Sequence, residues 1–143
     1  MSRSRGMSLI TAIFLLLILA ALGTYIVSIS GAQQSTSALD LMGSRAYHAA
    51  RAGVEFGTYQ AISAASCPAS TPLALSGNFG GFESVTVKCQ ATTFDEGGTS
   101  KILYLVTAIA CNQPTAGGIC PPVGAPGANY VERQLQGTVI NPP

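Results

Sequence analysis

The pattern of apolar and polar positions divides the chain into a long helical part and a shorter part rich in strands. Residues 6–29 contain no charged side chain, and the uncharged run continues to Leu39. A helix that spans the hydrocarbon core of a bilayer needs roughly 20 apolar residues. A segment in lipid must also satisfy its backbone hydrogen bonds internally. The sequence therefore predicts a transmembrane helix over residues 7–30, preceded by a short leader over residues 1–6.

Residues 31–66 are more polar but rich in alanine, and no proline precedes Cys67, so we expect the helix to continue through them. Spacings of three and four residues place a mostly apolar face on this amphipathic second half. Its members are Leu39, Met42, Ala46, Ala50, Val54 and Gly57. This face should pack closely against a sheet or another helix.

One helix is thus predicted from about Ser8 to Ala64, and Cys67-Pro68 should end it, because proline lacks a donor and clashes with the preceding turn. We expect the helix to be loosened near Gly23, or near Gly31 and residues 33–35. An interior glycine costs a helix about 1 kcal/mol relative to alanine.

Three strand-like runs follow a Ser-, Pro- and Gly-rich loop at residues 67–81. Residues 82–94 and 130–140 alternate between apolar and polar positions. Residues 101–111 are apolar on both faces and should form the central strand. A turn at residues 95–100 and a Gly/Pro loop at residues 112–128 separate the runs.

The first run places Val85 and Val87 on its apolar face and Thr86 on its polar face. In the last run Arg133 shares the apolar face, where it should either snorkel or pair at the rim. The predicted fold class is therefore α+β: a long N-terminal helix packed on a three- to four-stranded antiparallel sheet.

Charge sets the orientation of the predicted membrane helix. Arg3 and Arg5 precede the apolar run, and positive charge stays on the cytoplasmic side, so residues 67–143 should face the periplasm or the cell exterior. The net charge of +1 gives no reason to expect nucleic acid as a partner. A secretory signal cut near Gly31-Ala32 is the alternative, although the apolar run exceeds the 7–15 residues usual for such signals.

All four cysteines lie in the C-terminal part, which favours two disulfides in an oxidising compartment. Three pairings are possible. We favour Cys67–Cys89 and Cys111–Cys120, because each pair is nearest in sequence. Four reduced, buried thiols are the alternative. A zinc site is less favoured, because no Cys-x-x-Cys spacing occurs and the single histidine, His48, is distant in sequence.

The residues give no catalytic constellation, so we expect no enzyme, no cofactor and no metal. His48 stands alone in the helix. Asp95 and Glu96 lie beside glycines, but the twelve-residue pattern of a calcium loop is missing. Arg51 and Glu55 are spaced as an exposed helical ion pair, which contributes only a few tenths of a kcal/mol. A short loop closed by Cys111–Cys120 would staple a small core, or serve as a rigid exposed knob for adhesion or subunit docking.

The segment Arg5-Gly6-Met7-Ser8-Leu9-Ile10, followed by the apolar helix, resembles the N-terminus of type IV pilins and type II secretion pseudopilins. Residues 44–57 are similar to a small-residue stretch in the helices of tip-type minor pilins. Together with the downstream cysteines, these features look closest to the MshP-type minor pilins of the mannose-sensitive haemagglutinin (MSHA) pilus. The resemblance implies that a prepilin peptidase cuts between Gly6 and Met7 and methylates Met7.

One position departs from the pattern of that family. Most pilins carry a glutamate at the fifth mature position, which pairs with the N-terminal amine of the subunit ahead, whereas this chain has Thr11. Minor subunits at the filament tip commonly lack the glutamate. A helical threonine bonding its hydroxyl to a carbonyl one turn back is the simpler reading.

The resemblance implies a minor pilin that primes or caps a type IV pilus. Its partners would be other pilin subunits, the prepilin peptidase, the inner-membrane assembly platform and membrane lipid. It would first reside in the inner membrane as a single-pass protein with a periplasmic domain, and later in the pilus outside the cell. The alternatives are a type II secretion minor pseudopilin and a single-pass anchored periplasmic domain that joins no filament.

Overall fold

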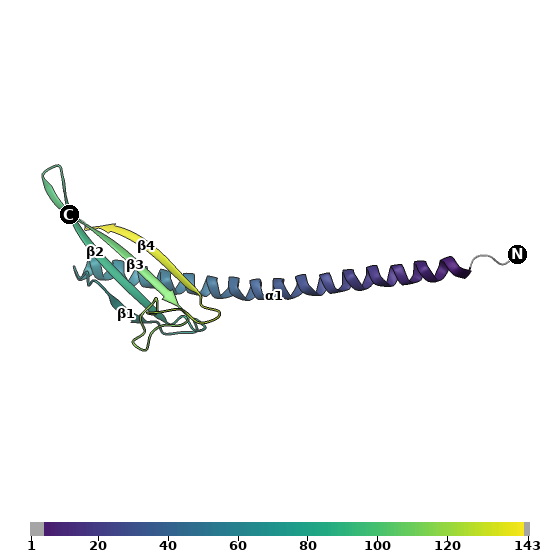
Figure 1. Cartoon of the computed structure of the whole chain (residues 1–143). Coiled ribbons are helices and arrows are strands. Elements are labelled where there is room, and N and C mark those ends of the chain that lie inside the picture. Colours follow the sequence, from purple (N-terminus) through teal and green to yellow (C-terminus); the bar gives the residue numbers. More distant parts are fainter. Residues whose placement is uncertain (1–4, 142–143) are drawn as a thin grey trace. The chain divides into compact units, whose positions relative to one another are not determined.

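The structure, a computed structural model of the chain, describes residues 5–141, with side chains from Leu9 onward except at Ala32 and Ser35. One helix precedes four strands in the order α1, β1, β2, β3 and β4 (Figure 1). The chain divides into two compact units, one up to Leu39 and one from Asp40 to Pro143, and the boundary falls within α1.

Helix α1 covers Arg5–Ser63, which is 59 residues. The expected loosening at Gly23, at Gly31 or at residues 33–35 is wrong, because the helix is continuous through all three. Gly23 and Gly31 are eight residues apart, so each is an isolated glycine within the helix. Its cost of about 1 kcal/mol is offset by unbroken helical hydrogen bonds on either side.

The helix ends at Ser63, within one residue of the predicted end at about Ala64 and four residues before Cys67. The amides of Ala64 and Ser66 both donate to the carbonyl oxygen of Gln60, at 3.1 and 3.2 Å. Ala65 between them has a φ of 47°, the left-handed conformation that commonly terminates helices. A local backbone cap, and not the proline, therefore stops α1.

The sheet has four antiparallel strands, ordered β1-β2-β3-β4: β1 Thr71–Ala74, β2 Ser84–Glu96, β3 Thr99–Cys111 and β4 Glu132–Ile140. The predicted α+β class is confirmed, because the latter part of α1 packs on this antiparallel sheet. The three predicted runs correspond to β2, β3 and β4, and β3 is an interior strand as expected. Residues 67–81 are not entirely loop, since they contain β1.

Strands β2 and β3 form a long hairpin whose turn is shorter than predicted. Their register runs from Val85↔Ala110 to Glu96↔Thr99, so only Gly97 and Gly98 connect them. These glycines have φ angles of 62° and 87°. A two-residue hairpin turn of this kind requires positive φ at both central positions, which glycine adopts without a steric penalty.

The main core lies between the sheet and the part of α1 that follows Leu39 (Figure 1). The helix contributes alanines to this core, the sheet contributes valines and alanines, and Phe82 precedes β2. The most buried members of the core are Ala46, Ala49, Ala50, Phe82, Val85, Val87, Val106, Ala108 and Ala110. The predicted apolar helix face is therefore correct from Met42 onward, whereas Leu39 is exposed.

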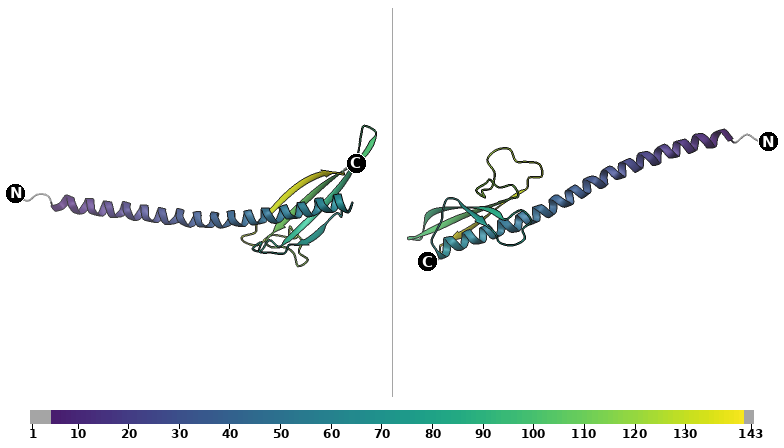
Figure 2. Two further views of the ribbon diagram at one scale, coloured as in Figure 1. Left: turned by 180° about the vertical axis from the view of Figure 1, so that it is seen from behind. Right: turned by 90° about the horizontal axis from the view of Figure 1, so that it is seen from below.

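A second, smaller cluster covers one end of the opposite sheet face. Ile109, Cys111 and Cys120 are buried there, and Tyr130 packs against them. The loop after β3 lies on the side of the sheet away from α1 (Figure 2, right). Thr86, predicted to be on a polar face, is therefore fully buried, and its hydroxyl accepts a hydrogen bond of 2.7 Å from the Cys120 amide.

Candidate functional site

The first part of α1 exposes apolar side chains all around the helix. Within the described part of the chain, α1 is the one helix long and apolar enough to cross a membrane, and none of its most apolar window, with a mean hydropathy of 2.6, is buried. Leucines, isoleucines and Phe14 between Leu9 and Ile29 are at least 40% exposed. A helix that is apolar on all sides requires lipid or protein around it. This segment is therefore the first candidate site.

The predicted processing residues lie at the start of this segment. Gly6 and Met7 belong to the first turns of α1, but their side chains lie outside the described residues, as does the leader before Arg5. Thr11 is an exposed residue of α1. Other threonines in the helix donate to carbonyls one turn back, as Thr24 does to Ala21 at 2.8 Å. The fold thus keeps all three positions on one continuous helix.

Glycines allow the second part of α1 to lie unusually close to the sheet. A Cβ atom added at Gly53 would be 2.7 Å from Val85 Cγ1, and one added at Gly57 would be 2.5 Å from Val106 Cγ1. Non-bonded carbon atoms pack best at about 3.5–4.0 Å. These two positions therefore set the distance between helix and sheet, a role for which Gly53 was not singled out from the sequence.

Arg133 lies on the apolar face of β4, where the sequence left two expectations open: snorkelling or pairing at the rim. Its guanidinium Nη2 lies 3.2 Å from the position that a Cβ atom of Gly43 would occupy, and its side chain remains exposed. Among the described residues one salt bridge occurs, Arg51–Glu55, at 3.0 Å between exposed side chains. Arg133 thus snorkels past the helix at a glycine and does not pair at the rim.

Both favoured disulfides are present. Cys67–Cys89 joins the segment after α1 to β2, with a Cα–Cα distance of 5.1 Å. Cys111–Cys120 joins the end of β3 to the following loop, with a Cα–Cα distance of 5.8 Å. The structure therefore has the pairing of nearest neighbours, and all four cysteines are disulfide-bonded rather than reduced.

Side-chain amides at the start of the loop between β3 and β4 hold the later part of that loop, beyond Cys120. Asn112 donates to the Asn129 carbonyl at 2.8 Å and accepts from the Val131 amide at 3.0 Å. Gln113 makes the same two kinds of bond, with Ala128 and Gly127. Val123, between Cys120 and these amide contacts, is 97% exposed. The sequence indicated the disulfide. It did not indicate that Asn112 and Gln113 hold the loop, because this depends on the course of the loop in space.

Tyr130 and Glu132 interact at the edge of this loop. The Tyr130 hydroxyl donates a short hydrogen bond to Glu132 Oε2. Burial, followed by this hydrogen bond and the negative charge of Glu132, raises the pKa of Tyr130 well above its usual value. The phenol is therefore held in its protonated form as a structural donor.

The other positions considered for chemistry remain apart from one another. His48 is exposed on α1, where its ring makes an edge contact with Tyr47. Asp95 accepts a hydrogen bond from the Gly98 amide at 3.0 Å and so caps the hairpin turn. Within residues 5–141, no group of three His, Cys, Asp or Glu side chains is placed to hold a metal ion.

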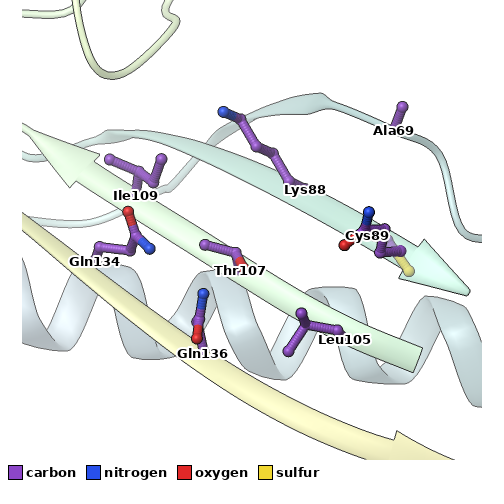
Figure 3. Close-up of a pocket in the computed structure, with 9 residues that line it drawn as sticks. Ala69, Lys88, Cys89, Leu105, Thr107, Ile109, Gln134 and Gln136 are labelled. Carbon is purple, nitrogen blue, oxygen red and sulfur yellow. The ribbon is translucent and has the colours of Figure 1, made fainter. Parts of the chain in front are cut away.

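The open face of the sheet carries a hollow of about 440 Å³ that sequence reasoning missed (Figure 3). Leu105, Thr107 and Ile109 of β3 line its middle, with Lys88 and Gln90 of β2 on one side and Gln134 and Gln136 of β4 on the other. The register aligns Lys88, Thr107 and Gln136 in one row across three strands. Only the strand register, which the sequence did not supply, brings these residues together.

Comparison of the chain with protein-family models, with curated proteins and with solved structures finds no match in any of the three. We therefore infer the function from α1, the sheet and the residues of the candidate sites.

Proposed function

We propose that this protein is a minor pilin, of the MshP type, that primes or caps the assembly of a type IV pilus. The observation that carries the proposal is one continuous helix with two distinct halves. Its first half exposes apolar side chains on all sides, and its second half packs through small residues on an antiparallel, disulfide-bonded sheet. A helix of this kind suits a protein that is stored in lipid and later packs among sister helices.

Processing is the first step of the proposed mechanism. The prepilin peptidase cuts between Gly6 and Met7 on the cytoplasmic side and methylates Met7. The polar leader is removed and the apolar helix stays in the product. A conventional secretory signal would instead lose its apolar segment. The C-terminal domain, with its two disulfides, faces the oxidising periplasm.

Transfer from lipid to filament is the second step. Lipid tails are as apolar as leucine side chains, so helices associate in membranes through van der Waals packing rather than through the hydrophobic effect. The inner-membrane assembly platform would deliver the apolar half of α1 to neighbouring pilin helices. The sheet domain would then be displayed on the filament.

Thr11 supports a position at the tip. A carboxylate inside the membrane is costly unless it is paired, and in related pilins it pairs with the subunit ahead. A subunit with threonine at this position needs no predecessor, which suits the first subunit to assemble.

Deletion and complementation test the proposal. A strain lacking the protein should have few or no surface pili, and the wild-type gene should restore them. A Gly6→Val variant should fail to restore pili, whereas a Gly43→Ala variant should succeed, because Gly43 lies outside the apolar half of α1 and a Cβ there would meet only the flexible Arg133 side chain. Normal piliation in the deletion strain would count against a pilus role. Intact pili combined with lost protein secretion would identify a type II secretion pseudopilin instead.

A further inference from the structure

The hollow on the open sheet face owes its shape to side-chain length. Long side chains stand on the two strands that flank β3, at Lys88 of β2 and at Gln134 and Gln136 of β4, while the shorter Thr107 lies between them on β3 (Figure 3). Gln90 of β2 also lines the hollow. From Leu105 to Ile109 the floor follows β3 for about 13 Å, at roughly 3.3 Å per residue. The result is a trough along β3, which we call the β3 groove.

One end of the β3 groove is closed and the other is open. Ile109 is only 5% exposed, because it packs in the second cluster with Cys111 and Cys120. The volume of about 440 Å³ falls within the range of small-molecule sites, roughly 300–1,000 Å³. A short linear ligand could therefore lie along β3 and extend past Leu105.

The polar side chains of the β3 groove are available to a ligand. Lys88, Gln90, Thr107, Gln134 and Gln136 make no side-chain hydrogen bond or ion pair with another described residue. Glu132, the acidic residue of β4 on the same face, lies four positions from Gln136 and accepts the hydrogen bond of Tyr130. Lys88 is thus a cation without a carboxylate partner among the described residues.

The chemistry of this lining distinguishes between ligand classes. Carboxamides and hydroxyls each donate and accept hydrogen bonds, as sugar hydroxyls do. An extended peptide binds a sheet chiefly through main-chain hydrogen bonds at an edge, which the face of a sheet does not offer. The single lysine matches one negative charge on the ligand.

We propose that the β3 groove binds an acidic oligosaccharide, with its carboxylate on Lys88 and its hydroxyls on Thr107, Gln134 and Gln136. All of these residues belong to the unit from Asp40 onward. The site therefore does not depend on whether the protein joins a pilus.

Calorimetric titration of the full-length protein in detergent micelles tests this site. The probes are tetragalacturonate and a hyaluronan hexasaccharide, with neutral maltotetraose and a tetraglutamate peptide as comparisons. At least one acidic saccharide should bind about ten-fold more tightly than either comparison ligand. A charge-assisted hydrogen bond of ordinary strength accounts for a factor of this size.

Arg51 offers a matched control, because it is an exposed cation on α1, which packs on the opposite face of the sheet from Lys88. Lys88→Gln should weaken binding about ten-fold and Gln136→Ala about three-fold, as expected for one charged and one neutral hydrogen bond. Arg51→Gln, which changes net charge equally, should leave binding within about two-fold. Circular dichroism would confirm that each variant folds.

Three results would overturn the proposal. In the first, neither acidic saccharide binds. In the second, tetraglutamate binds as tightly as the saccharides, which would assign the groove to acidic peptides. In the third, Lys88→Gln and Arg51→Gln weaken binding equally, which would reveal general charge attraction only.

Discussion

At the scale of single residues, several side chains have roles that follow from what surrounds them. Thr86 is fully buried because the loop after β3 covers it, and its hydroxyl satisfies the Cys120 amide. Arg133 stays exposed by passing the helix at Gly43. Tyr130 is tied to Glu132 next to the second core. Each of these side chains stabilises the loop or the helix–sheet contact rather than performing chemistry.

Tyr130 makes the free energy of unfolding depend on pH in alkaline solution. Its pKa is raised in the folded protein, so the unfolded chain loses the phenolic proton first as the pH rises above about 10. The stabilisation by Tyr130 should be fully present below about pH 10 and should be lost progressively above it.

Urea unfolding at pH 8 to 11.5 checks this prediction. The wild-type free energy of unfolding should fall at the alkaline end, and Tyr130→Phe should remove much of that fall while lowering stability at pH 8. Tyr59→Phe, at a residue 68% exposed, is the control and should leave the profile unchanged. Parallel profiles for wild type and Tyr130→Phe would show that Tyr130 has no such role.

At the scale of elements, the contact between α1 and the sheet depends on side chains being absent from the helix. Valines of β2 and β3 approach Gly53 and Gly57 so closely that a methyl group would overlap them. Other glycines of the same helix face different surroundings. At Gly43 the nearest neighbour is the end of the flexible Arg133 side chain.

This difference predicts opposite effects of the same substitution. Gly57→Ala should lower the free energy of unfolding by about 1–3 kcal/mol through overpacking. Gly43→Ala should be neutral or raise it by up to about 1 kcal/mol, because alanine favours the helix and Arg133 can move aside. Urea unfolding of both variants measures the effects. Equal effects would mean that the helix and sheet are not held at the distance described.

How well the elements were predicted depended on their length and pattern. The long periodic runs of α1, β2, β3 and β4 were identifiable from hydrophobic periodicity. Strand β1 was not, because four residues containing Pro72 show little pattern, and it exists through pairing with the edge of β2. The end of α1 before Cys67-Pro68 depends on Ala65 adopting a left-handed conformation, which alanine seldom does.

The candidate sites also differ in whether the sequence alone could reveal them. The apolar half of α1 and the disulfide pairs follow from runs and spacings that lie along the chain. The β3 groove does not, because Lys88, Thr107 and Gln136 come from three strands and meet only in one register. A shift of one residue in that register would turn these side chains to the other face.

At the scale of the whole molecule, one chain contains both an apolar helical segment and a disulfide-bonded α+β domain. The first unit up to Leu39 offers a surface suited to lipid or sister helices. The second unit contains both core clusters, both disulfides and the β3 groove. The proposed pilin role requires that the apolar segment remain in the mature protein.

The mass of the mature N-terminal peptide, measured on protein purified from membranes, tests that requirement most directly. We predict that the mature protein begins at Met7 with a methylated amine and retains the apolar helix. An intact Met1 would identify a plain membrane anchor. A chain that begins near Ala32 or Gln33 would contradict the account, because the segment that it needs for assembly would have been discarded during export.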